Sequence, residues 1–112
     1  MKAAHAAYIT QRLELTPGEA EKFWPVYREY AEKRRGLRRQ LRETHRDEAN
    51  EEKLLELDLK IQQDELDLEK EYLQKFQKII PAEKLIKLRQ AEADFRKLIL
   101  RQIQQRQRHR RN

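Results

Sequence analysis

Apolar and aromatic side chains recur at steps of three or four residues along most of this chain, and this spacing constrains its fold more than any other feature. In one segment the steps are 4, 3, 4, 3 and 4 residues, through Phe23, Tyr27, Tyr30, Arg34, Leu37 and Leu41. Such spacing places side chains on one side of a helix. The 15 Leu and 10 Ala, against 2 Gly, 3 Pro and a single Val, also favour helices over strands. We therefore expect an all-α fold.

A helix start signal follows a short first helix that is expected over residues 3–14. Thr16 can cap the next helix through its hydroxyl, Pro17 suits the first helical position, and Glu19 completes a capping box. We expect this second helix to run from Pro17 to about residue 45.

Three further positions indicate where the second helix bends and where the third and fourth helices begin. Pro25 lies inside the second helix and removes one backbone hydrogen bond, so we expect a bend after Trp24. Asn50 precedes two glutamates and predicts the start of a third helix. Pro81 ends that helix and can serve as the first residue of a fourth, whose apolar stripe ends at Ile103. The pattern predicts one short helix and three long ones.

The third helix carries two apolar seams. The first consists of Leu55, Leu59, Gln62, Leu66, Glu69, Leu73, Phe76 and Ile80. The second consists of Leu54, Leu57, Ile61, Asp64, Leu68, Tyr72, Lys75 and Ile79. Three long helices enclose little interior, so we expect the second seam, with Phe23, Trp24 and Tyr27, to stay exposed unless another subunit covers them. The sequence predicts an elongated, hairpin-like protomer that forms a homodimer.

Charge is strongly segregated along the chain, which has a net charge of +6. Residues 33–46 hold seven basic residues and one acid, whereas residues 47–71 hold eleven acids and three lysines. The two blocks lie beside each other if the chain doubles back near residues 47–50. The last twelve residues hold five arginines and no acid. We expect one helical domain over 1–104 and a basic tail over 105–112, as a frayed helix end or a disordered segment.

Several kinds of chemistry are excluded by the residues that are missing. The chain has no Cys and no Ser, which removes thiolate and serine nucleophiles, disulfides and zinc–thiolate sites. It contains no glycine-rich loop and no nucleophile with an adjacent base. We expect no enzymatic activity, no cofactor and no small-molecule substrate. None of the three histidines has the Glu-x-x-His spacing of di-iron bundles, so we expect solvated histidines and no metal site.

Two segments resemble a known family. Residues 9–27 read ITQRLELTPGEAEKFWPVY, and residues 80–84 read IPAEK and lead into QAEADFR at 90–96. Over about residues 8–100 the chain resembles the Spy/CpxP-related LTxxQ family of periplasmic helical proteins, particularly its small envelope-stress members. The family motif is assigned a structural role at Leu15, Thr16, Glu19, Phe23, Trp24, Pro25, Tyr27, Ile80 and Pro81.

The chain departs from the family pattern at both motif sites. At the first, Glu19 replaces the family's Gln and keeps the capping-box geometry. At the second, Ile80 and Pro81 with Lys84 replace Leu-Thr and Gln, which removes the capping hydroxyl. The second site therefore matches in position only.

The resemblance implies an exported protein of the periplasm, whose leader has been removed from this chain, and a cradle-shaped antiparallel dimer. It implies either an ATP-independent chaperone or envelope-stress adaptor that binds unfolded or misfolded proteins, or a metal or stress sensor that binds a membrane-bound signalling partner. The motifs look like fold determinants and do not distinguish these roles.

Four arginines are the candidate client-binding residues: Arg34, Arg38, Arg39 and Arg42. They alternate with Leu37 and Leu41, and a mixed basic and apolar surface can hold unfolded chains without specific geometry. In the competing interpretation the two leucines are core and the arginines pair with the acidic block.

Nucleic-acid binding is a weaker alternative. The isoelectric point near 9.7 and the two arginine-rich segments favour it. The adjacent acids, the absence of a recognised binding motif and the lack of aromatics among the tail arginines count against it.

Overall fold

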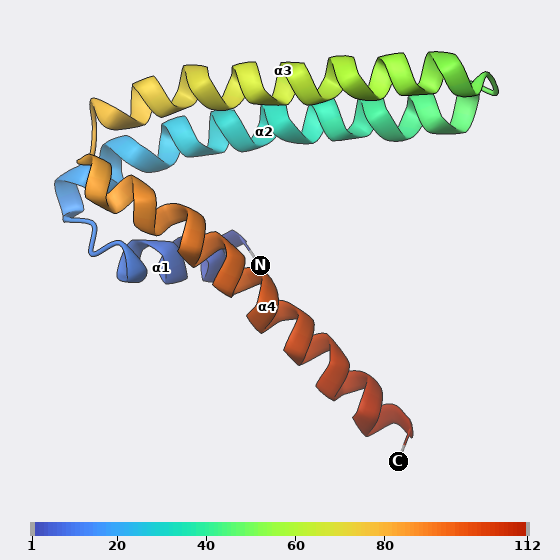
Figure 1. Ribbon diagram of the computed structural model, residues 1–112. Coiled ribbons are helices and arrows are strands. Elements are labelled where there is room, and N and C mark those ends of the chain that lie inside the picture. Colours follow the sequence, from blue (N-terminus) through green and yellow to red (C-terminus); the bar gives the residue numbers. More distant parts are fainter. Residues whose placement is uncertain (1, 112) are drawn as a thin grey trace. The chain divides into compact units, whose positions relative to one another are not determined.

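The computed structural model describes residues 2–111, and the side chains of 3–110. This part of the chain contains four helices and no strand (Figure 1). The helices are α1 (Lys2–Arg12), α2 (Pro17–Asp47), α3 (Glu51–Gln77) and α4 (Ala82–Arg111). The prediction of an all-α protein is confirmed.

The helix boundaries lie close to the local signals in the sequence. α2 begins at Pro17 and continues on both sides of Pro25. Asn50 caps α3, because its side chain accepts a hydrogen bond from the Lys53 amide at 3.2 Å. Pro81 precedes α4, and its carbonyl accepts the first helical hydrogen bonds, so it stands one position before the place predicted for it.

The basic C-terminal segment is helical as far as the structure describes it. α4 continues past Ile103 to Arg111, through the segment for which we expected a frayed helix end or disorder. Gln and Arg are good helix formers, which is sufficient to extend the helix without an apolar face. Every side chain from Arg101 to Arg110 is exposed; residue 112 lies outside the described residues.

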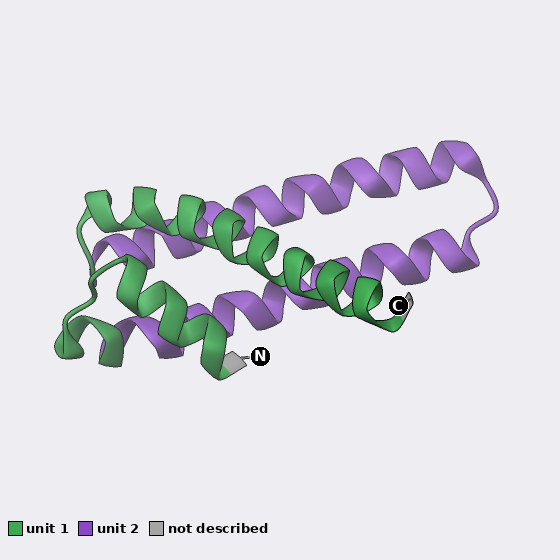
Figure 2. Ribbon diagram, turned by 90° about the horizontal axis from the view of Figure 1, so that it is seen from below, with its two compact units in different colours: residues 1–21, 80–112 green, residues 22–79 purple. Residues whose placement is uncertain are grey.

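The chain divides into two compact units (Figure 2). Unit 1 comprises residues 1–21 and 80–112, and unit 2 comprises residues 22–79. Unit 1 holds α1 and α4. Unit 2 holds most of α2 together with α3, which run side by side in opposite directions.

In unit 1, α1 packs on the N-terminal half of α4. The buried apolar side chains are Ile9, Leu13, Leu15, Ile80, Leu85 and Ala91. Polar contacts border them: His5 Nε2 lies 2.9 Å from a Glu92 carboxylate oxygen, and the Arg12 guanidinium donates to Asp94 at 2.9 Å. The hydrogen bond from Arg12 lowers the pKa of Asp94.

In unit 2, α2 and α3 share an aromatic core. Phe23 contacts Phe76 with ring centroids 5.1 Å apart, and Tyr30 contacts Tyr72 at 5.3 Å. Phe23, Tyr72 and Phe76 are buried, as is Tyr27. The expectation that Phe23 and Tyr27 stay exposed without a second subunit is therefore wrong, because the rings of α3 cover them.

The two seams of α3 are used in the opposite way from that predicted. The second seam, expected to be exposed, supplies the buried Ile61 and Tyr72. The first seam supplies Phe76 and Ile80 to the interior, but its leucines face solvent. We call these leucines the leucine row, which consists of Leu55, Leu59, Leu66 and Leu73.

Candidate functional site

The two segments that resemble the family motif, which we call the motif sites, meet in unit 1. Glu19 accepts a hydrogen bond from the Thr16 backbone amide at 2.9 Å, and the Thr16 hydroxyl accepts one from the Glu19 amide at 3.1 Å. This is the predicted capping box. The Lys84 ammonium, from the second motif site, reaches the same Glu19 carboxylate at 2.5 Å and also donates to the Glu14 carbonyl at 2.9 Å.

Lys84 thereby ties together the end of α1, the start of α2 and the first turn of α4. Glu14 lies just after α1 and has a φ of 52°, and the Leu15 amide donates back to the Thr10 carbonyl at 3.1 Å, as in a Schellman-type helix end. The hydrogen bond from Lys84, followed by that from the Thr16 amide, lowers the pKa of Glu19. The arrangement is structural and offers no open site.

The remaining motif residues occupy two kinds of environment. Ile80, like Leu15, is buried in unit 1, and Pro81 is exposed just before α4. Trp24 is half-buried in unit 2, with its ring 5.0 Å from that of Phe23. Pro25 is exposed within α2. The motif thus divides between the capping junction of unit 1 and the aromatic core of unit 2.

The candidate client-binding arginines lie along α2 in unit 2. Arg34 is half-buried, with its guanidinium carbon 5.3 Å from the centroid of the Tyr30 ring. Arg38, Arg39 and Arg42 are exposed. Among the described side chains these three form no ion pair. The acidic residues of α3 therefore do not hold them.

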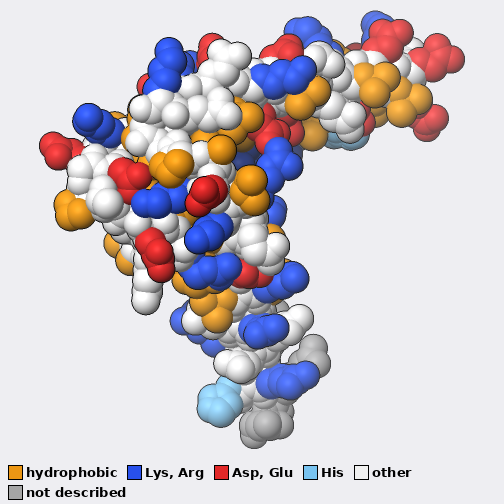
Figure 3. Space-filling model, turned by 60° about the vertical axis from the view of Figure 1, so that its left-hand side comes forward, with side chains coloured by type: hydrophobic (Ala, Val, Ile, Leu, Met, Phe, Trp, Pro, Cys, Tyr) orange, Lys and Arg blue, Asp and Glu red, His pale blue; other side chains and the backbone are white. Residues whose placement is uncertain are grey.

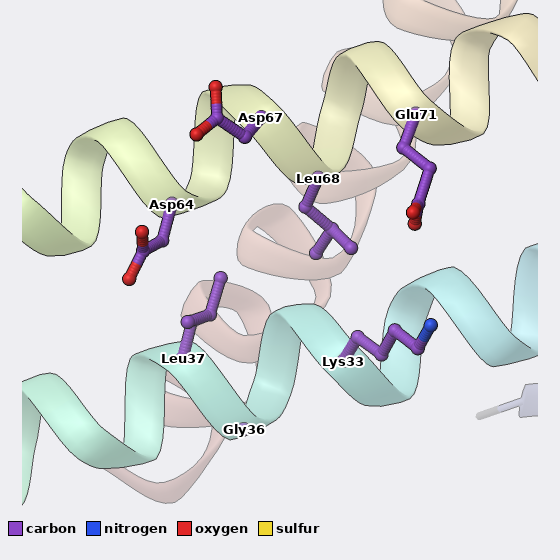
Figure 4. A pocket seen from close by; sticks show the side chains of 7 residues that line it. All are labelled: Lys33, Gly36, Leu37, Asp64, Asp67, Leu68 and Glu71. Atoms are coloured by element: carbon purple, nitrogen blue, oxygen red, sulfur yellow. The ribbon is translucent and has the colours of Figure 1, made fainter.

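A shallow groove opens between α2 and α3 beside these arginines (Figure 4). It has a volume of about 450 Å³. Leu37 and Leu68 point into the space between the two helices, Lys33 lies on the α2 side, and three carboxylates lie on the α3 side. The lining residues are Lys33, Gly36, Leu37, Asp64, Asp67, Leu68 and Glu71.

Gly36 lines this groove on the α2 side. A Cβ at this position would have no neighbouring atom within 4 Å, so the space is not required for packing the helices. Leu37 and Leu41 are both half-buried. The two leucines belong to the edge of the core, while Arg38, Arg39 and Arg42 project from it.

Polar contacts brace the aromatic core next to the groove. The Tyr72 hydroxyl donates to Glu29 at 2.8 Å, and Lys33 lies 3.6 Å from the same carboxylate. The Tyr72 hydrogen bond lowers the pKa of Glu29, and the positive charges of Lys75 and Lys33 add to the effect. These contacts fix the edge of α2 from which the groove begins.

The leucine row is the largest apolar feature exposed on α3. Leu55 and Leu59 are each 66% exposed, and Leu66 and Leu73 are 44% and 43% exposed. Their spacing of 4, 7 and 7 residues aligns them along one side of the helix. An aligned row of this kind, unlike scattered surface leucines, indicates a surface that packs against another helix.

Two of the three histidines, for which we expected solvation, have carboxylate partners. His5 lies beside Glu92, as described above, and His45 Nε2 lies 2.6 Å from Asp58, which links the facing ends of α2 and α3. His109 is exposed. Within residues 2–111, no group of three or more His, Cys, Asp or Glu residues is arranged to hold a metal ion.

No family model, curated protein or solved structure matches this chain. None of the helices in the described part of the chain is both long enough and apolar enough to span a membrane.

Three features of the site were not found from the sequence. Lys84 was treated only as a departure from the motif, although it carries the contact between the two motif sites. We expected the second seam of α3 to be exposed, but the exposed leucine row belongs to the first seam. The groove lies between two helices, and the single glycine that lines it, Gly36, gives no such signal by itself.

Proposed function

We propose that the protein is an ATP-independent chaperone of the periplasm that binds unfolded or misfolded proteins as a homodimer. The resemblance of its two motif segments to the LTxxQ family supports the cellular location. One structural observation carries the binding function. Exposed arginines of α2 that form no ion pair with any described side chain lie beside an open groove, lined in part by leucines, between α2 and α3.

This surface offers both kinds of contact that an unfolded chain can use. Arg38, Arg39 and Arg42 supply long-range attraction for acidic segments, which speeds the first encounter. Leu37 and Leu68 supply apolar contact at short range, and the (CH₂) stems of the arginines extend it. Because neither contact requires a fixed partner geometry, the surface suits clients of many sequences.

The leucine row supports the dimer. From Leu55 to Leu73 it runs over 18 residues, about 27 Å of helix. Its 4, 7, 7 spacing is that of a coiled-coil seam, in which an identical row on a second helix fills the spaces between side chains. An antiparallel pairing of two such rows fits the cradle-shaped dimer that the family resemblance implies, and leaves the arginines of α2 free for clients.

The chaperone function is tested by suppression of aggregation. A reduced, acidic client protein is diluted from denaturant with and without the wild-type protein, and light scattering is followed. The variant with Arg34, Arg38, Arg39 and Arg42 replaced by Gln should suppress scattering several-fold less well. The variant with Arg101, Arg106, Arg108 and Arg110 replaced by Gln loses the same charge from α4 and should keep most of the activity.

The opposite result is also informative. If the α2 variant suppresses aggregation as well as the wild type does, the arginines are not the client surface. If the wild-type protein itself fails to suppress aggregation at a several-fold excess over three unrelated clients, the chaperone proposal is wrong.

A further inference from the structure

The C-terminal half of α4 is the most uniformly basic surface of the protein. After Asp94 the sequence contains no acid, and between Arg96 and Arg110 it contains six basic residues. All side chains from Arg101 to Arg110 are exposed. Figure 3 shows the Lys and Arg side chains along the tapering lower arm, which is the C-terminal part of α4.

These arginines have no role within their own unit. The contacts of α1 with α4 involve residues as far as Phe95. In the described part of the chain, Arg101, Arg106, Arg108 and Arg110 form no ion pair. Four like charges on three helical turns repel one another, so the segment gains stability from an anionic partner.

The positions of the arginines around the helix indicate the shape of that partner. Arg101 and Arg108 are seven residues apart and lie on one side of α4, because seven residues make almost two full turns. Arg106 and Arg110 are four residues apart and lie on the opposite side. A flat surface could contact only one of these sides, whereas a groove with anionic walls could contact both.

Beyond Ile103 the segment also lacks what a bilayer requires. A helix that lies in a membrane surface needs an apolar face, and no apolar residue follows Ile103. Apart from Ile103, the side chains between Arg101 and Arg110 that separate the arginines are glutamines and His109, which can form hydrogen bonds to phosphate, sugar or base edges.

We propose that the C-terminal half of α4 binds double-stranded DNA by entering the major groove and pairing its arginines with phosphates on both walls. The groove is about 12 Å wide and admits one α-helix, whose diameter with side chains is 10–12 Å. Residues 97–110 extend over about 20 Å, which corresponds to about six base pairs. Binding of this kind is independent of base sequence and depends strongly on salt. This inference does not rest on the chaperone proposal and is an alternative to its periplasmic location, because chromosomal DNA is absent from the periplasm.

The test uses the full chain and a fluorescently labelled DNA duplex of about 20 base pairs, with anisotropy measured at 50 and 200 mM salt. The wild-type protein should bind at 50 mM salt with a dissociation constant of roughly 1 to 100 μM and much more weakly at 200 mM. Replacing Arg101, Arg106, Arg108 and Arg110 by Gln should weaken binding at least tenfold. It should also reduce the slope of log K against log salt by about 3 to 4.

Two matched variants separate this site from general charge and from folding. The α2 variant, with Arg34, Arg38, Arg39 and Arg42 replaced by Gln, loses the same four charges and should bind within about threefold of the wild type, because those arginines lie on α2, outside the segment that we propose enters the groove. Replacing the four α4 arginines by Lys keeps the charge and should retain most of the binding. Circular dichroism checks that helix content is unchanged in each variant.

Several results would overturn the proposal. One is that the wild-type protein does not bind the duplex at 50 mM salt and 100 μM protein. The others are that the α2 variant loses as much affinity as the α4 variant does, or that the corresponding single strand binds as tightly as the duplex. If the protein binds phosphatidylglycerol vesicles or poly-glutamate more tightly than the duplex, the partner of the C-terminal half of α4 is a membrane or an acidic protein and the proposal is wrong. The aggregation assay is measured separately on the same variants, so a failure of either proposal is recognised independently of the other.

Discussion

Lys84 and Glu19 lie 65 residues apart in the sequence and form a 2.5 Å contact between ammonium and carboxylate. Glu19 belongs to the first motif site and Lys84 to the second, which matches the motif in position only, and each side chain is only about one-fifth exposed. Glu19 at the same time completes the capping box of α2. One carboxylate therefore contacts both the nearby Thr16 amide and the distant Lys84 ammonium. The start of α2 and the start of α4 are thereby coupled.

Because of this coupling, we expect the stability of the folded protein to depend on pH. Because the pKa of Glu19 is lowered in the folded protein, its contribution is complete above the ordinary pKa of about 4.5 and is lost as the pH falls through the lowered value. Glu19→Gln keeps the cap but removes the charge. We expect the variant to be less stable than the wild type at pH 7, and the difference to shrink below pH 4.5.

Urea unfolding at pH 7, 5 and 3.5 measures this difference. The ordinary Glu21, which is exposed on the same helix turn, provides the control: Glu21→Gln should change the midpoint little at any of these pH values. A constant gap between Glu19→Gln and wild type across the range would show that the charge of Glu19 does not matter.

The Thr16 hydroxyl should contribute measurably to the stability of α2. It accepts the Glu19 amide at 3.1 Å, and removing such a cap costs about 1 kcal/mol. Thr16→Ala should therefore lower the free energy of unfolding by about that amount. Thr44→Ala is the matched control, because the Thr44 hydroxyl only donates back to the Gln40 carbonyl inside the helix. Equal effects of the two substitutions would contradict a capping role.

The residues that share a helix face could be predicted from the sequence, but the face that packs could not. Thr16 and Asn50 mark helix starts because capping is decided within four residues. The two seams of α3 have the same 3-and-4 periodicity, so spacing alone cannot rank them. Their use depends on where Tyr72 and Phe76 meet the rings of α2, a contact between residues more than 40 positions apart.

Glu14 occupies a backbone conformation that glycine adopts more readily. Its φ of 52° lies in the left-handed region at the end of α1, where glycine carries no steric penalty. Glu14→Gly should therefore raise the free energy of unfolding by about 1 kcal/mol. The same substitution at Glu21, inside α2, should lower it by about 1 kcal/mol. Chemical denaturation of both variants measures the two signs, and a loss of stability in Glu14→Gly would contradict the assignment.

The leucine row should control assembly without affecting the folded protomer. Because Leu55, Leu59 and Leu66 are already exposed, replacing them by Gln removes no core contact. Sedimentation equilibrium at tens of micromolar should give twice the 13.8 kDa chain mass for the wild type and a monomer for the triple variant. Ile86→Gln, at a 74% exposed site on α4, should remain dimeric. A monomeric wild type would reject the dimer.

The arginines of α2 should matter for client capture and not for stability. Arg38, Arg39 and Arg42 have no ion-pair partner among the described residues, and Gln is also a good helix former. The triple Gln variant should therefore unfold at the wild-type urea midpoint. Its association with an acidic unfolded client, followed by stopped-flow fluorescence, should be several-fold slower at low salt, because long-range attraction acts on the encounter.

Salt provides the internal control for this prediction. Raising the ionic strength to about 0.5 M shortens the Debye length to a few Å, so the wild-type rate should fall toward that of the variant. Arg35→Gln breaks the contact of Arg35 with Glu32 and removes a neighbouring charge, and its effect on the rate should be smaller than that of the triple change. A lowered unfolding midpoint with an unaltered capture rate would assign the arginines to pairing with the acidic helix, and the client surface would then have to lie elsewhere.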